Sequence, residues 1–180
     1  MRRWAVVAAS ILLLGGCSAA PSPATEGPDA QLDYLLAHWD ERNTEQFGSF
    51  GGTDCVNFTS QGLLARGWTM DEDWWHLDVL WTHQYAKAWV SSTAFRDYLA
   101  EHPERAVETT EAEVVVGDIV QFDYDNSGNR DHTATISRID PDGSIMVVQH
   151  SDDADYRSVD DQLALHVEGD GRVYYWHVLP

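Results

Sequence analysis

The 180-residue sequence has few cysteines and little positive charge. It holds two cysteines, Cys17 and Cys55, and eleven Lys and Arg residues against thirty Asp and Glu residues, for a formal charge of −19 at pH 7. Two cysteines cannot build a disulfide framework, and so negative a chain is a poor partner for nucleic acid. The acidic residues are spread along the chain, which indicates a solvated surface rather than a substrate site.

The sequence also lacks an apolar run long enough to span a bilayer as a helix. The apolar segment Ala5–Leu14 is too short, and it follows Arg2 and Arg3, which is the layout of a secretory signal peptide over residues 1–16. It leads into a Leu-Gly-Gly-Cys sequence that ends at Cys17 and resembles a bacterial lipobox. At a lipobox, signal peptidase cleaves before the cysteine, and a diacylglycerol is attached to its sulfur. The alternative is an ordinary signal peptide that happens to contain a cysteine.

Lipidation of Cys17 would anchor the protein at the extracytoplasmic face of a cell membrane, with the lipid bilayer as a partner. Residues 17–28 are rich in Ala, Pro, Ser and Gly and have no apolar period, so we expect a disordered tether. Residues 29–180 then form one domain of ordinary size. Loss of Arg2 and Arg3 with the signal leaves nine basic against thirty acidic residues, a charge of −21.

Cys55 is left without a partner inside the chain if Cys17 carries lipid. A lone cysteine in an exported protein is more often a nucleophile than a structural residue. Two glycines precede it, Asp54 is a residue type that caps helices, and an apolar periodicity runs from there to Gly67. We therefore predict that Cys55 lies in the first turn of a helix, where the helix dipole stabilises a thiolate. The alternative is a buried cysteine that acts as a small hydrophobe.

The segments on either side of Cys55 also predict helices. Leucines and a tryptophan recur at helical spacing over residues 29–42, and Ser92 is placed to cap a helix that stops before Pro103. Between them, residues 68–89 hold five of the eight Trp residues. Packing in a core explains these aromatics better than an aromatic-lined cleft for a sugar or a peptide.

After Glu113 the apolar period becomes two, which predicts strands. The candidate strands are Asp118–Tyr124, His132–Ile139, Ser144–His150 and Arg172–Val178. Helices followed by strands predict an α+β fold with an antiparallel sheet. Residues 123–131 resemble the start of an EF-hand calcium loop, but Ala134 stands where the loop needs its last acidic ligand, so a hairpin loop is favoured. We therefore expect neither a metal nor another cofactor.

A turn at residues 140–143, of sequence Asp-Pro-Asp-Gly, fixes the register of the strands that flank it. It places His132 opposite His150 or Ser151, and directly opposed residues have Cα atoms about 4.5–5.5 Å apart. The sequence thus predicts two imidazoles side by side on adjacent strands. One could take the proton of a cysteine thiol while the other orients the first. The alternative is coincidence, since the chain has eight histidines.

Several fragments carry a family resemblance. They are Gly52-Thr-Asp-Cys-Val-Asn-Phe-Thr-Ser-Gln61, Ala88-Trp89 ahead of Phe95-x-x-Tyr98-Leu99, Gly117-Asp-Ile-Val-Gln121 ahead of Asp131-His132, and Gln149-His150. From about Tyr34 to the C-terminus the chain resembles the bacterial putative amidase domain family, which is similar in layout to the papain-like wall hydrolases of the NlpC and CHAP types. The resemblance implies a papain-like α+β fold and amide hydrolysis, often of peptidoglycan stem peptides. By position, it implies that Cys55 is the nucleophile, His132 the base and His150 the third polar group.

These observations lead to the hypothesis of an exported, lipid-anchored cysteine amidohydrolase or peptidase that cleaves a peptide amide bond in cell-wall peptidoglycan. A rival from a different class is a catalytically inactive lipoprotein of the same fold that binds the wall or a peptide. A protease or acyltransferase acting on proteins would use the same three residues, so the sequence does not separate it from the first hypothesis. The sequence does not identify substrate-binding residues or the donor that completes an oxyanion hole.

Overall fold

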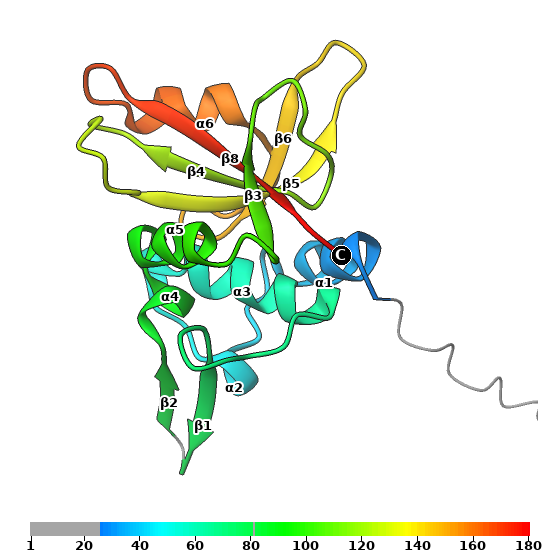
Figure 1. Cartoon of the computed structure of the whole chain (residues 1–180), viewed down its shortest axis with the longest axis vertical. Helices are drawn as coiled ribbons and strands as arrows, with labels where there is room; N and C mark the ends of the chain where they lie inside the picture. The colour runs from blue at the N-terminus through cyan, green and yellow to red at the C-terminus, as the bar shows by residue number, and fades with distance from the viewer. Residues whose placement is uncertain (1–25, 81) are drawn as a thin grey trace, which may run out of the picture.

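The computed structural model describes residues 26–80 and 82–180. They form a mixed α and β structure in which a six-stranded antiparallel sheet carries helices on both faces (Figure 1). The predicted signal peptide, the lipidated Cys17 and nearly all of the tether lie outside the described residues. Within the described part of the chain, no helix has the length and apolar character needed to cross a membrane.

The large sheet has the strand order β3-β8-β4-β5-β6-β7, and each pair of neighbouring strands is antiparallel. Its strands are β3 (Ala106–Thr109), β4 (Ile119–Asp123), β5 (His132–Ile139), β6 (Ile145–Gln149), β7 (Ala154–Ser158) and β8 (Arg172–Val178). A separate hairpin of β1 (His76–Val79) and β2 (Thr82–Tyr85) projects from the helical side of the molecule (Figure 1).

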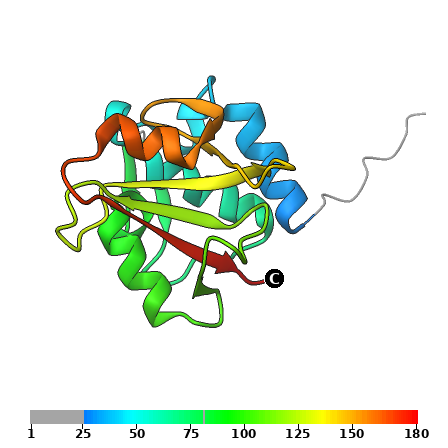
Figure 2. The same ribbon diagram turned by 90° about the horizontal axis from the view of Figure 1, so that it is seen from above.

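The helices form two layers around this sheet. They are α1 (Pro28–His38), α2 (Thr44–Phe47), α3 (Cys55–Arg66), α4 (Lys87–Val90), α5 (Ser92–Glu101) and α6 (Val159–His166), with a 3₁₀ turn at Gly51–Thr53. The helices α1, α3 and α5 lie on one side of the sheet and α6 lies on the other (Figures 1 and 2). The sheet is therefore covered on both faces.

Both faces of the central strands are buried, because side chains alternate along a strand and each face meets a helical layer. On the side of α3 and α5, Trp74 and Trp89 are fully buried in a cluster that includes Ile119 of the sheet. On the side of α6, Phe122 and Val159 belong to a second cluster. The prediction that the aromatics of residues 68–89 pack in a core is confirmed for these tryptophans.

Two glycines shape α3, the helix that begins at Cys55. Gly67 ends it with a left-handed φ of 112°, and its N–H contacts the carbonyl oxygens of Leu63 and Leu64. Gly62 faces α1, where an added Cβ would lie 2.8 Å from atoms of Leu35. The absence of a side chain at Gly62 therefore lets α1 pack closely on α3.

The predicted elements are found with small changes. The four predicted strands correspond to β4, β5, β6 and β8, and the helices that begin at Cys55 and Ser92 are present. The helix predicted over residues 29–42 ends earlier, at His38. The sequence analysis did not predict the β1–β2 hairpin, β3, β7 or α6.

The predicted helix caps need correction. The Asp54 carboxylate makes no capping bond to α3; it accepts instead from the backbone N–H of Phe50 at 2.9 Å and from the side chain of Asn57 at 3.0 Å. Ser91, not Ser92, caps α5, since its hydroxyl accepts from the backbone N–H of Ala94. Because Ser91 supplies the cap, the hydroxyl of Ser92 is left to contact Cys55, with its Oγ 3.6 Å from Sγ.

Candidate active site

Cys55 is the first residue of α3, which packs against the strand β5. The first N–H groups of a helix have no acceptor within it, so the positive end of the α3 dipole lies at the thiol. Cys55 is 7% exposed and lines a cleft of about 560 Å³. The side chain is thus buried among protein groups and still reachable from the cleft.

His132, the first residue of β5, contacts the thiol of Cys55. Burial alone raises the pKa of Cys55, but His132 and, to a smaller extent, Ser92 and Thr133 outweigh it, so this pKa lies below its usual value. Burial alone lowers the pKa of His132, and the hydrogen bond and charge of Cys55 outweigh that effect, so this pKa lies above its usual value. The two shifts favour a thiolate beside an imidazolium.

Gln149, the last residue of β6, holds the other side of the His132 ring. Nε2 of His132 lies 3.0 Å from Oε1 of Gln149. The amide nitrogen of Gln149 donates to Oε1 of Gln162 at 2.7 Å and to the backbone oxygen of Asp152 at 3.0 Å, which leaves its oxygen to accept from His132. Nε2 therefore carries a hydrogen, and Nδ1 is the nitrogen left to exchange a proton with Cys55.

His150 does not join His132, and this corrects the sequence prediction. The strands β5 and β6 pair in a register that, when continued, places Ser151 opposite His132. Because side chains alternate along a strand, His132 and Gln149 share one face of the sheet and His150 lies on the other. There the His150 ring stacks on Phe58 of α3, with ring centroids 3.6 Å apart.

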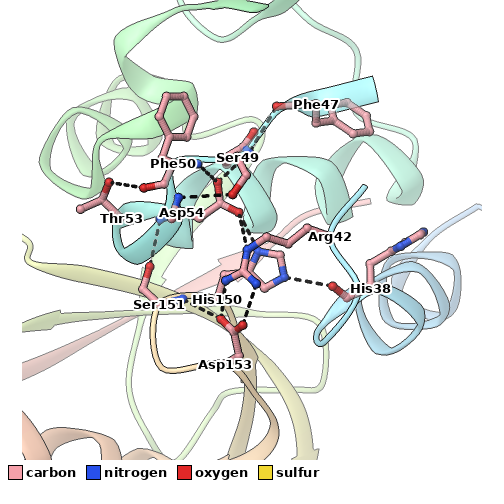
Figure 3. Close-up of polar contacts among 12 residues, drawn as sticks. His38, Arg42, Phe47, Ser49, Phe50, Thr53, Asp54, His150, Ser151 and Asp153 are labelled. Atoms are coloured by element: carbon pink, nitrogen blue, oxygen red, sulfur yellow. Dashed lines mark hydrogen bonds and ion pairs between the residues drawn. The ribbon is translucent and has the colours of Figure 1, made fainter. Parts of the chain in front are cut away.

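His150 belongs instead to a polar network between α3 and the turn that follows β6 (Figure 3). Its Nδ1 lies 2.8 Å from Oδ2 of Asp54, and its Nε2 lies 3.0 Å from the backbone oxygen of His38. Arg42 lies 3.6 Å from Asp54 and pairs with Asp153 at 2.6 Å. We call Asp54, His150, Arg42 and Asp153 the clamp. Both ring nitrogens of His150 thus face oxygen atoms.

The clamp fixes the spacing of the two candidate catalytic side chains. Asp54 directly precedes Cys55, and His150 directly follows Gln149, which holds His132. The backbone N–H of Asp54 also donates to Oγ of Ser151 at 2.9 Å. The start of α3 is therefore tied to the end of β6 through both the backbone N–H and the carboxylate of Asp54.

Two further groups contact the sulfur of Cys55. Oγ of Ser92, the first residue of α5, lies 3.6 Å from Sγ, and the backbone of Thr133 in β5 acts to lower the pKa of the thiol. Both contacts favour the thiolate. Three elements, α3, α5 and β5, thus meet at this one atom.

The rest of the cleft is polar and carries charge of both signs. Asp131, Asp152, Arg130 and His166 line it together with Tyr124. Asp152 accepts hydrogen bonds from His166 and from Gln162 of α6. Side chains of this kind can bind the polar groups of a peptide.

The loop of residues 123–131 is a hairpin connection from β4 to β5, as the sequence predicted. Asp123 is fully buried, and its carboxylate accepts from the backbone N–H groups of Ser127 and Gly128 at 2.9 Å each. The carboxylates of Asp125 and Asp131 come within 4.8 Å of it. The loop delivers the chain to His132 at the start of β5.

The sequence analysis missed Gln149 and Ser92. In the sequence Gln149 stands only as the neighbour of His150, although the alternation of β6 places the two side chains on opposite faces. Ser92 was assigned to capping, and a shift of one residue in the start of α5 gives that role to Ser91. No periodic pattern marks Ser92 as a neighbour of Cys55, because the contact joins residues 37 positions apart.

A family model described as "Putative amidase domain" matches residues 26–176. Two uncharacterized proteins of Bacillus subtilis (strain 168) are similar to part of the chain. YjcM is 32% identical over 94 residues, which cover 47% of this chain and 21% of YjcM. YhbB is 27% identical over 114 residues, which cover 58% of this chain and 35% of YhbB. The chain thus spans well under half the length of these curated relatives. No solved structure matches it.

Proposed function

The chain belongs to the putative amidase domain family, and we propose that it is a cysteine-dependent amidohydrolase that cleaves a peptide amide bond. The family supports a hydrolase that acts on amides. The observation that carries the cysteine mechanism is the pairing of Cys55 with His132, whose Nε2 is held at 3.0 Å by Gln149. In this proposal Cys55 is the nucleophile, His132 is the acid and base, and Gln149 takes the role that the sequence analysis gave to His150.

The proposed reaction is acyl transfer through a thioester. The Cys55 thiolate attacks the amide carbon, and the S–C bond forms as the carbonyl electrons move to oxygen. When the carbonyl re-forms, the C–N bond breaks and His132 gives its proton to the leaving nitrogen. A water molecule then gives a proton to His132 and attacks the thioester, which releases the carboxylic acid and restores the thiolate.

The proposed substrate is a stem peptide of cell-wall peptidoglycan, and the proposed place is the extracytoplasmic face of a membrane, with Cys17 as the lipid anchor. The lipobox-like sequence and the family resemblance support this setting. A polar cleft of about 560 Å³ beside Cys55 can take a few peptide residues. A protease or acyltransferase that acts on proteins would use the same chemistry.

The competing proposal is a wall- or peptide-binding lipoprotein without turnover. Incubation of the protein with defined muropeptides, followed by mass spectrometry, separates the two. We expect wild type to release a new amine and a new carboxylate from one bond, and Cys55→Ala and His132→Ala to release none. Binding of muropeptides with no cleavage by wild type would favour the competing proposal.

A further inference from the structure

The hydroxyl of Ser92 is a buried group that faces the reacting atom. Ser92 is 6% exposed, it lines the same cleft as Cys55, and its Oγ lies 3.6 Å from Sγ. Capping of α5 does not explain this position, since Ser91 supplies the cap. The Ser92 hydroxyl is therefore available to act at the sulfur or beside it.

The backbone of Ser92 is fixed from within the sheet. Nε2 of Gln121 in β4 donates to the backbone oxygen of Ser92 at 2.9 Å and to Oγ1 of Thr133 at 3.1 Å. Oε1 of Gln121 accepts from Nε1 of Trp176 at 3.0 Å. Gln121 is fully buried and satisfied on both sides of its amide. The place of the Ser92 hydroxyl is thus set before any substrate arrives, which is the condition for efficient electrostatic stabilisation.

Building on the proposed function, we infer that the Ser92 hydroxyl is the second donor of the oxyanion hole, acting with the backbone N–H of Cys55. The N–H of the first residue of α3 has no acceptor within the helix, so it is free to donate. The oxyanion develops on the oxygen of the carbon that bonds to Sγ, so it forms within a few ångströms of the sulfur. A hydroxyl already in contact with Sγ can reach the distance of about 2.7–3.1 Å at which donors act on an oxyanion.

The hydroxyl would change partners during the reaction without losing its proton. In the resting state it donates to the Cys55 thiolate. When the S–C bond forms, the negative charge moves from sulfur to the carbonyl oxygen, and the Ser92 O–H rotates to donate there. When the C–N bond breaks and the carbonyl re-forms, the O–H returns to its first orientation. The bond to the oxyanion exists only in the tetrahedral state, which is the kind of contact that accelerates a reaction.

The test compares two reactions of Cys55, of which only one forms an oxyanion. A full-length Cys17→Ser background leaves Cys55 as the single cysteine of the chain. Iodoacetamide alkylates the thiolate by displacement of iodide, whereas p-nitrophenyl acetate acylates it through a tetrahedral oxyanion. In this background we expect Ser92→Ala to slow acylation by about 10²–10³-fold at equal thiolate content, which is the effect of losing one oxyanion-hole donor. Alkylation should change by only a few-fold.

Two further variants control for structure. Ser92→Thr keeps the hydroxyl and should recover most of the acylation rate. Ser137→Ala removes another buried serine hydroxyl, one that bonds to the backbone oxygen of Asp155, and should leave both rates unchanged. Thermal unfolding of each variant reports whether it is folded.

Other outcomes would overturn the inference in distinguishable ways. An equal loss of both reactions in Ser92→Ala would mean that Ser92 only stabilises the thiolate, and no loss of either would mean that it has no role in the chemistry. In both cases the nucleophile assigned under the proposed function would stand. The parent protein carries Cys17→Ser and keeps Ser92. If its Cys55 reacts with both probes no faster than glutathione does, the proposed function fails, and the role of Ser92 fails with it.

Discussion

At the scale of single residues, two neighbours in the chain have different roles. Gln149 orients the base His132, and the next residue, His150, belongs to the clamp. Gln149 shares a face with His132 and accepts from its Nε2, whereas His150 points to the opposite face and pairs with Asp54. A glutamine amide can hold an imidazole as a second imidazole would, because its oxygen accepts while its nitrogen is fixed by other acceptors.

The first prediction concerns Gln149. We expect Gln149→Ala to leave the His132 ring loosely placed and to lower amide turnover about 10²-fold. The hydrogen bond to Gln149 contributes to the raised pKa of His132, so its removal lowers that pKa. In a pH profile of iodoacetamide labelling, the limb that reports loss of the His132 proton therefore moves to lower pH. The limb that reports Cys55 ionisation should stay below the value of an ordinary thiol, about 8.5.

Gln149→Glu is the matched control for this prediction. It keeps an acceptor of nearly the same size and adds a negative charge beside His132, so the same limb should move to higher pH. Shifts of opposite sign in the two variants would identify the contact between Gln149 and His132 as their source. Identical profiles in wild type and both variants would show that Gln149 does not hold the base.

The sequence was sufficient to single out Cys55 and His132, but not their partners. A lone cysteine after two glycines is a local pattern, and the register of the turn at residues 140–143 together with the family resemblance pointed to His132. The contacts of Gln149 with Gln162 and of Ser92 with Cys55 join distant segments, and they depend on α6 and on the exact start of α5. Side-chain orientation of this kind follows from packing, which a single sequence does not report.

At the scale of elements, the clamp joins three connections that are far apart in the chain. It holds the segment after α1 through Arg42, the start of α3 through Asp54, and the turn after β6 through His150 and Asp153. The four strands with clear alternation were predictable from the sequence. The short strand β7 and the eight-residue helix α6 were not, because neither has a long apolar period, yet α6 supplies the residue Gln162 that fixes Gln149.

A second prediction concerns the Asp54–His150 pair of the clamp. Both side chains are 1% exposed, and removal of one partner leaves a polar atom of the other buried without its hydrogen bond. We expect Asp54→Asn to lower the free energy of unfolding by about 3–5 kcal/mol at pH 7, measured by urea denaturation. Asp153→Asn removes a more exposed partner of Arg42 and should cost less than about 1 kcal/mol. Equal effects of the two substitutions would contradict this account of the clamp.

The same pair predicts a pH dependence of stability. Burial alone raises the pKa of Asp54, but hydrogen bonds from His150, Asn57 and the backbone of Phe50 outweigh it, so this pKa is lowered in the folded state. A lowered carboxyl pKa stabilises the fold above the unfolded value of about 3.9 and loses this effect as the pH falls through the folded value. The difference in unfolding free energy between wild type and Asp54→Asn should therefore be largest near neutrality and shrink below about pH 4.

At the scale of the whole molecule, charge and the length of the proposed tether together would set where a lipid-anchored domain could work. The formal charge of −19 gives a mean repulsion from anionic lipid headgroups. The ten residues between Cys17 and Pro28 could span at most roughly 40 Å when fully extended. An anchored domain would thus remain within this distance of the membrane surface although its charge disfavours contact.

The last prediction tests the anchor, which lies outside the described residues. If Cys17 is acylated, its lipid holds this acidic chain at a membrane, so Cys17→Ser should move the full-length protein from the carbonate-washed membrane fraction to the soluble fraction in a bacterial host. Cys55→Ser, which alters the other cysteine, should leave it in the membrane fraction. Metabolic labelling with a fatty acid should mark wild type and Cys55→Ser but not Cys17→Ser.

Two results would contradict the anchor: retention of Cys17→Ser in the washed membranes, or a wild-type protein without fatty-acid label. The substrate of the site at Cys55 would then have to be argued without reference to the membrane.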